Sequence, residues 1–126
     1  MNAIDLVAVL AILQLVFFGV MAGRARAKSG LKAPAMTGDA GFERAYRVQM
    51  NTIELMVAFL PSLYIAAKYW PTSYVVGAGI LYLIGRMIYW RSYTNAPETR
   101  AFGFALSMIP ILALIIGILA ALLLRF

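Results

Sequence analysis

Two long runs without charged residues limit what this chain can fold into. One run lies between Asp5 and Arg24, the other between Arg100 and Arg125, and both are mostly apolar. A helix of about 20 residues rises about 30 Å, the thickness of the hydrocarbon core of a bilayer. The two runs therefore predict two transmembrane helices.

Two shorter apolar runs, over residues 55–67 and 69–85, reach the same length if the polar residues beside them lie at membrane depth inside a bundle. The 126 residues are 63% hydrophobic and 13% charged, whereas soluble domains are about 45–50% apolar. We therefore expect an all-α integral membrane protein, a four-transmembrane-helix bundle that forms a single domain over residues 1–126. Its helices are expected at about residues 3–26, 42–69, 72–94 and 97–124, with Asp39 as a helix cap.

The basic residues predict how the bundle is oriented. In a four-helix hairpin, most of them fall at the end that holds the first and third connections, and only Lys68 and Arg125 fall at the other end. The positive-inside rule then places those connections in the cytoplasm and both termini outside. The basic residues of the cytoplasmic end are Arg24, Arg26, Lys28, Lys32, Arg44, Arg47, Arg86, Arg91 and Arg100.

The net charge of +6 is explained by this topology and by a site, not by nucleic-acid binding, because no soluble basic surface is expected. The first apolar run does not resemble a signal peptide, because its basic cluster follows it. We expect that run to stay in the mature protein. The absence of a retention tail and the compact connections favour a bacterial inner membrane.

Cysteine and histidine are absent from the sequence. The chain thus has no thiol nucleophile, imidazole base, disulfide or Cys/His metal site of its own. If the protein is an enzyme, we expect its nucleophile to arrive with a substrate and no metal to take part.

A polar stripe continues into the second predicted helix, in the segment FERAYRVQMNTIE of residues 42–54. Arg47, Asn51 and Glu54 follow one another at i, i+4 and i+7, which places them on one helix face. Glu54 lies about 16 Å along the axis from Glu43, at membrane depth. Such a carboxylate is expected to face the bundle interior.

A second stripe lies on the third predicted helix, where Arg86, Tyr89 and Tyr93 are spaced at i, i+3 and i+7. Arg86 is expected at the depth of Glu54 and also inside the bundle. One interpretation is a structural ion pair between Glu54 and Arg86 that sets the register of the two helices.

The surplus of arginine favours an anionic ligand. Arg26, Arg47 and Arg100, with Arg44 as a further candidate, are expected around one cytoplasmic-side cavity, and a single glutamate cannot neutralise them. Tyr89 and Tyr93 would add hydroxyl donors, while Gln49 and Asn51 could bind amide groups. Together these groups suit a small peptide with more than one carboxylate. In the alternative interpretation, basic residues such as Arg24, Lys28, Lys32 and Arg91 serve only as orientation signals.

The strings FERAYRVQMNTIE and LYLIGRMIYWRSYTNAPETR, in this order, resemble the membrane-associated proteins in eicosanoid and glutathione metabolism, the MAPEG family. The resemblance is strongest to the branch of leukotriene C synthase and the microsomal glutathione transferases, and it covers nearly the whole chain. It implies a homotrimer with glutathione bound at each subunit interface. It also implies that Arg100 is the catalytic arginine that stabilises the glutathione thiolate. The glutathione-binding residues that it implies are Arg26, Arg47, Gln49, Asn51, Glu54, Arg86, Tyr89 and Tyr93.

Three positions depart from the family pattern. Ala27 replaces a second arginine and Leu55 a tyrosine of the leukotriene synthase branch, and Ala101 lacks the hydroxyl of the prostaglandin synthase branch. These departures favour a general detoxifying glutathione S-transferase over a dedicated eicosanoid enzyme. Glutathione is then the co-substrate, and the second substrate is a hydrophobic electrophile that enters from the membrane lipid between helix 1 of one subunit and helix 4 of another. Residues such as Phe102, Leu106 and Ile109 lie there, although each is more simply a packing or lipid-facing residue.

Three further functions remain open at this point. The same thiolate could reduce lipid hydroperoxides, as a glutathione peroxidase does. The chain could instead be a non-catalytic protein of the same family that presents lipid to a partner. A small multidrug exporter has similar length and hydrophobicity, but it needs an embedded carboxylate, usually in helix 1, where this chain has only Asp5 at the tip.

Overall fold

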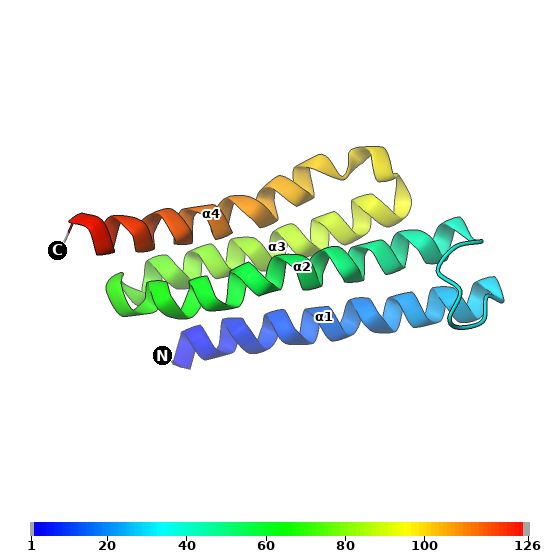
Figure 1. Cartoon of the computed structure of the whole chain (residues 1–126), viewed down its shortest axis with the longest axis horizontal. Coiled ribbons are helices and arrows are strands. Elements are labelled where there is room, and N and C mark those ends of the chain that lie inside the picture. The colour runs from blue at the N-terminus through cyan, green and yellow to red at the C-terminus, as the bar shows by residue number, and fades with distance from the viewer. Residues whose placement is uncertain (1, 125–126) are drawn as a thin grey trace.

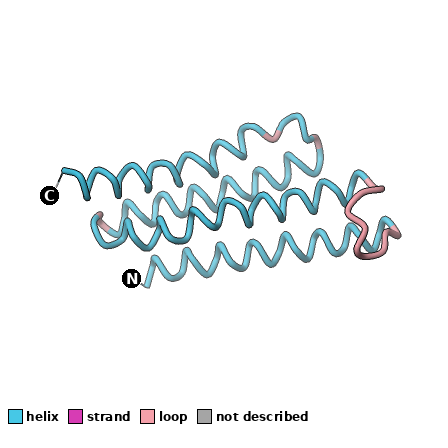
Figure 2. The backbone as a smooth tube through the Cα atoms, viewed as in Figure 1, coloured by secondary structure: helices cyan, strands magenta, loops and turns pink. Residues whose placement is uncertain are grey.

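Four long helices form an antiparallel bundle in the structure, a computed structural model that describes residues 2–124 (Figure 1). The start of α1 and the end of α4 lie at one end of the bundle, and the α1–α2 loop and the α3–α4 connection lie at the other (Figures 1 and 2). Arg125, expected at the same end as Lys68, lies outside the described residues. The elements are α1 (Asn2–Ser29), α2 (Ala40–Tyr69), α3 (Thr72–Asn95), a 3-10 helix η1 (Pro97–Thr99) and α4 (Ala101–Leu124).

All four helical segments are long and apolar enough to cross a membrane, which confirms the predicted spans. Large apolar side chains cover the outside of the bundle, as lipid contact requires. Examples are Leu13, Val57, Ile84 and Ile109. The chain thus has the exterior of an integral, multi-pass membrane protein.

Two helix boundaries differ from the sequence-based expectation. The first helix continues to Ser29, three residues beyond Arg26, and ends where Gly30 adopts a φ of +81°. The fourth segment begins as the 3-10 turn η1, with Pro97 at its start, and becomes α-helical only at Ala101. Arg100 therefore lies at the junction between the two helices, directly before α4.

The start of α2 is fixed by two reciprocal hydrogen bonds. The Phe42 nitrogen donates to Oδ2 of Asp39 at 2.9 Å, and the Gly38 nitrogen donates to Oε2 of Glu43 at 2.9 Å. The first bond confirms Asp39 as the predicted cap and satisfies one of the N–H groups that a helix start leaves without partners, and the second ties Glu43 to the residue before the cap. The cap determines where α2 begins, and so how far along it Arg47 and Asn51 lie.

Glycines bring α3 and α4 together backbone to backbone. A Cβ atom added at Gly85 would come within 2.6 Å of the Ser107 nitrogen, and one added at Gly103 within 2.5 Å of the Tyr89 nitrogen. Small residues permit such close approach between helices in a membrane. The contact places the first turn of α4, which follows Arg100, beside Tyr89 on α3.

Candidate functional site

A cavity of about 220 Å³ lies among α2, α3 and the start of α4. Arg100 directly follows η1, so the cavity lies at the end of the bundle that holds the α3–α4 connection. The sequence-predicted stripes meet here, because α2 contributes an arginine and an amide, α3 two tyrosines, and the α4 segment an arginine and an aromatic ring. The lining residues are Arg47, Asn51, Tyr89, Tyr93, Arg100 and Phe104.

The two tyrosines form one wall of this cavity. The ring centroids of Tyr89 and Tyr93 are 5.5 Å apart, and Tyr89 is 6.2 Å from Phe104. Tyr89 is buried, whereas Tyr93 is half-buried. Aromatic contacts of this kind hold the rings in place, so that their hydroxyls are available as donors at defined positions.

Arg86 lies beneath the cavity and is fully buried, as its sequence position predicted. Its Nη1 donates to Oδ1 of Asn51 at 2.8 Å and to Oγ1 of Thr52 at 3.1 Å, and its Nε donates to Oγ of Ser107 at 2.9 Å. These bonds join α3 to both α2 and α4. Arg86 does not line the cavity; it supports residues that do.

Glu54 does not pair with Arg86, so the predicted ion pair is wrong. Within residues 2–124 the guanidinium of Arg86 bonds to neutral oxygens, while Glu54 is exposed on the outside of the bundle. Three residues after Asn51 correspond to a rotation of about 60° around the helix, which carries Glu54 away from α3. The expectation that Glu54 faces the interior is therefore also wrong for a single chain.

Arg26 and Gln49 lie on the α1 side of α2, away from this cavity. Nη1 of Arg26 donates to the Ala35 carbonyl at 2.8 Å, and its guanidinium lies 4.3 Å from the centre of the Phe42 ring. A Cβ added at Gly19 of α1 would lie 3.2 Å from Nε2 of Gln49. A single chain therefore brings Arg47 and Arg100 to one cavity but leaves Arg26 outside it, contrary to the sequence-based expectation.

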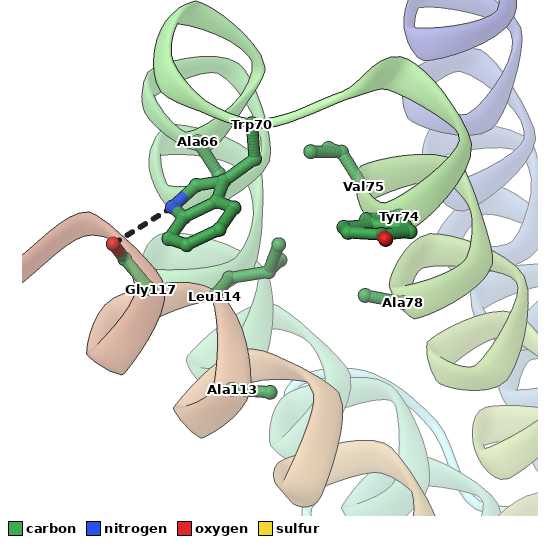
Figure 3. A pocket seen from close by; sticks show the side chains of 8 residues that line it. All are labelled: Ala66, Trp70, Tyr74, Val75, Ala78, Ala113, Leu114 and Gly117. Atoms are coloured by element: carbon green, nitrogen blue, oxygen red, sulfur yellow. Dashed lines mark hydrogen bonds between the residues drawn. The ribbon is translucent and has the colours of Figure 1, made fainter. Parts of the chain in front are cut away.

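A second cavity, of about 240 Å³, lies toward the opposite end of the bundle and is almost entirely apolar (Figure 3). Nε1 of Trp70 donates to the Gly117 carbonyl at 2.8 Å and ties the end of α2 to α4. No charged side chain lines this cavity within the described part of the chain. Its lining residues are Ala66, Trp70, Tyr74, Val75, Ala78, Ala113, Leu114 and Gly117.

The arginine-lined cavity can bind an anion through several donors at once. Arg47 and Arg100 carry positive charge at neutral pH, and the tyrosine hydroxyls and the Asn51 amide add neutral donors. Among residues 2–124 no group of three or more His, Cys, Asp or Glu side chains could hold a metal ion. The arginines, tyrosines and amide that line the cavity can bind and stabilise negative charge.

Sequence reasoning did not identify Thr52, Ser107 or Phe104. Thr52 follows Asn51 directly, and Ser107 is a polar residue in an uncharged run, seven residues after Arg100 on the same helix face. Both signals were present in the sequence, because a hydroxyl at membrane depth needs a partner. Phe104 had no signal, since one phenylalanine among many apolar residues is not distinctive.

Comparison with known proteins gives one family. The sequence matches the MAPEG family over residues 4–120. It is 43% identical over 101 residues to an uncharacterized protein of Synechocystis sp., with 80% of this chain and 74% of the relative covered. It is 35% identical over 102 residues to human microsomal glutathione S-transferase 2, with 81% and 69% covered. Leukotriene C4 synthase of Cavia porcellus is 32% identical over 94 residues, with 75% and 63% covered.

Proposed function

The chain belongs to the MAPEG family, and on this basis we propose that it is a membrane-bound glutathione S-transferase that activates the glutathione thiolate for attack on hydrophobic electrophiles. The observation that carries the proposal is the cavity that contains both Arg47 and Arg100 beside Asn51, Tyr89 and Tyr93. Glutathione has two carboxylates and a thiol, so Arg47 and Arg100 can each contact a different anionic group of this peptide.

Arg100 is the residue that we assign to the thiolate. It lies directly before the first turn of α4, where the helix dipole adds to the positive potential of its guanidinium. A fixed cation and a helix N-terminus both lower the pKa of a thiol from about 8.5 toward neutral. The thiolate then attacks the electrophilic carbon, a carbon–sulfur bond forms, and the leaving group departs with the electron pair of the bond that breaks. Arg47, Asn51 and the tyrosines bind and orient the peptide.

The glutathione site is proposed to be completed by a neighbouring subunit of a homotrimer. Arg26 and Gln49 face away from the cavity of their own chain, and Glu54 is exposed at membrane depth. An ionised group in contact with lipid costs several kcal/mol, so a covering protein surface is favoured. If adjacent subunits pack there, Arg26 and Gln49 of one chain reach the Arg100 cavity of another.

The second substrate is proposed to enter from the bilayer. Phe102 and Ile109 of α4 are exposed and apolar. Leu106, which lies between them in the sequence, is half-buried. A path along this face, between α4 of one subunit and α1 of another, would lead a hydrophobic electrophile from lipid toward Arg100. The apolar second substrate and the charged peptide would thus approach from different sides.

We also propose a bacterial inner membrane, with the cavity on the cytoplasmic side and both termini outside. The α1–α2 loop and the α3–α4 connection share one end of the bundle (Figure 2), and the basic residues Arg24, Lys28 and Lys32 lie at that end. The positive-inside rule supports this orientation.

The same cavity supports a second activity, as a glutathione peroxidase toward lipid hydroperoxides, because one thiolate can attack either carbon or a peroxide oxygen. A lipid-presenting protein would not need an arginine in the cavity to stabilise a thiolate. A multidrug exporter is disfavoured because Arg47 and Arg100 would repel a cationic drug.

The test is a titration of the detergent-purified protein with glutathione, followed by thiolate absorbance in the ultraviolet near neutral pH. We expect a saturable thiolate signal in the native protein, its loss in Arg100→Ala, and its retention in Arg91→Ala. Arg91 is an exposed arginine near the same end of the bundle, outside the cavity. Binding without a thiolate signal would favour a ligand-holding protein, and no binding at all would overturn the proposal.

A further inference from the structure

Arg86 has no carboxylate partner and yet is completely buried. Within residues 2–124 its hydrogen bonds go to neutral side chains, and its Nη2 atom is buried without a hydrogen-bond partner. Buried charges are normally paired, and an unmade hydrogen bond in the interior lowers stability. The arginine therefore needs an explanation beyond packing.

Its hydrogen bonds join three helices under the arginine-lined cavity. On α2 it contacts Asn51 and Thr52, and on α4 it contacts Ser107, whose Oγ in turn donates to the Gly103 carbonyl at 2.7 Å. Gly103 lies in the first turn of α4, three residues after Arg100. The positions of the α2 and α4 walls of the cavity thus both depend on one guanidinium.

The contact with Asn51 also determines which end of its amide faces the cavity. A guanidinium can only donate hydrogen bonds, so the atom that Arg86 contacts at 2.8 Å must be the carbonyl oxygen of Asn51. The NH₂ group of Asn51 is then left to face the cavity that this residue lines. Asn51 is fixed as a donor, suited to a carboxylate or carbonyl oxygen of a ligand.

Arg86 acts on Tyr89 in a similar way. The guanidinium carbon lies 4.4 Å from the centre of the Tyr89 ring, in a cation–π contact. Tyr89 lines the cavity, so the ring separates the buried charge from a bound ligand by a single side chain. In an interior with little water to screen it, the charge of Arg86 adds to the attraction that Arg47 and Arg100 exert on an anion.

We propose that Arg86 is a positioning residue, which holds the Asn51 amide as a donor toward an anionic ligand and adds an uncompensated positive charge beneath it. The inference rests on the proposed glutathione site and changes the role expected of Arg86 from a direct ligand contact to a support. The ligand group that Asn51 meets is accordingly a hydrogen-bond acceptor, one of the carboxylates or carbonyls of glutathione.

The experiment is a double-mutant cycle on the detergent-purified protein, with the Kd of glutathione measured by isothermal titration calorimetry. Arg86→Gln and Asn51→Ala should each weaken binding by about tenfold or more, the effect of losing a hydrogen bond to a charged group. If Arg86 acts through Asn51, the Kd of the double variant should lie within about threefold of the Kd of the single variant that binds glutathione more weakly. Tyr93→Phe, combined with Arg86→Gln, is the matched control, and there the two losses should multiply.

Asn51→Asp tests the orientation of the amide. Aspartate keeps an acceptor for Arg86 but presents no donor to the cavity, and its carboxylate repels an anionic ligand, so thermal stability should be retained while glutathione binds at least as weakly as in Asn51→Ala. Arg86→Lys keeps a positive charge in a side chain that fits the same space. It should recover part of the glutathione affinity that Arg86→Gln loses.

Two results would overturn the inference: native affinity in a folded Arg86→Gln variant, or losses for Arg86→Gln and Asn51→Ala that multiply as they do for Tyr93→Phe. Should Arg86→Gln fail to fold, the decision rests on Asn51→Asp, because native affinity in that variant contradicts the donor role. Failure of the native protein to bind glutathione would instead overturn the proposed function, and is seen before any variant is compared.

Discussion

Gly103 of α4 lies against the backbone of Tyr89 on α3, so close that a Cβ at position 103 would fall 2.5 Å from the Tyr89 nitrogen and 2.6 Å from its Cα. Real side chains do not approach backbone atoms to such distances. Because Arg100 lies three residues before Gly103, this contact holds Arg100 and Tyr89 at one cavity. The spacing of α3 and α4 is thus part of the site.

Gly103→Ala should lower the stability of the protein and weaken glutathione binding together. The added methyl group meets backbone that cannot rotate away, so the helices must separate, at a cost of about 1–3 kcal/mol. Thermal unfolding in detergent and a glutathione titration measure the two effects. Gly77→Ala is the control, because a Cβ there meets nothing within 4 Å and alanine favours a helix by up to about 1 kcal/mol. Equal stability of both variants would contradict this account of the α3–α4 contact.

Asp39→Ala should destabilise the start of α2. The Oδ2 atom of Asp39 accepts from the Phe42 nitrogen at 2.9 Å, and loss of such a cap costs about 1 kcal/mol. Hydrogen exchange of the Phe42 amide should become faster, while Asp39→Asn, which keeps an acceptor, should stay close to the native rate. An equally fast exchange in both variants would show that the side-chain acceptor is not what holds this helix end.

Trp70→Phe should lower stability without changing the Kd of glutathione. The indole Nε1 donates to the Gly117 carbonyl at 2.8 Å (Figure 3), and Trp70 follows the end of α2 that lies opposite the α3–α4 connection and Arg100. Removal of that hydrogen bond costs about 1 kcal/mol. Thermal unfolding and a glutathione titration check the two parts, with Tyr74→Phe at the exposed neighbour as the control. A changed Kd in Trp70→Phe would mean that the two ends of the bundle are coupled.

Mixed oligomers test whether the site is shared between subunits. Coexpression of Arg26→Ala with Arg100→Ala, each expected to be inactive alone, should restore activity in about one third of the sites of each mixed trimer, because an intact site then needs two different neighbours in one order. Arg47 and Arg100 line the cavity of a single chain, so coexpression of Arg47→Ala with Arg100→Ala should restore none. Recovery in the second pair, or in neither pair, would contradict the proposed division of the site. Glutathione conjugation by tandem-purified mixed oligomers is the measurement.

The polar stripes on α2 and α3 show which side-chain positions helical spacing predicts correctly and which it does not. Spacing along one helix placed Arg47 with Asn51, and Tyr89 with Tyr93, and in the structure both pairs line one cavity. The same reasoning correctly predicted that Arg86 is buried. It was wrong for Glu54, which the period places within about 20° of Arg47 around the helix and which is nevertheless exposed, because a helical period gives the direction of a side chain and not whether another helix packs over it.

The sequence by itself determined the four spans, the helix cap at Asp39 and the membership of the family, since all of these depend on neighbouring residues and on a chain-long pattern. Only the tertiary structure decided which partners Arg86 has and which side of α2 holds Arg26 and Gln49. The physical reason is that periodicity fixes the faces of each helix, whereas the rotation and distance between helices follow from packing. Here that packing depends on the absence of side chains at Gly85 and Gly103.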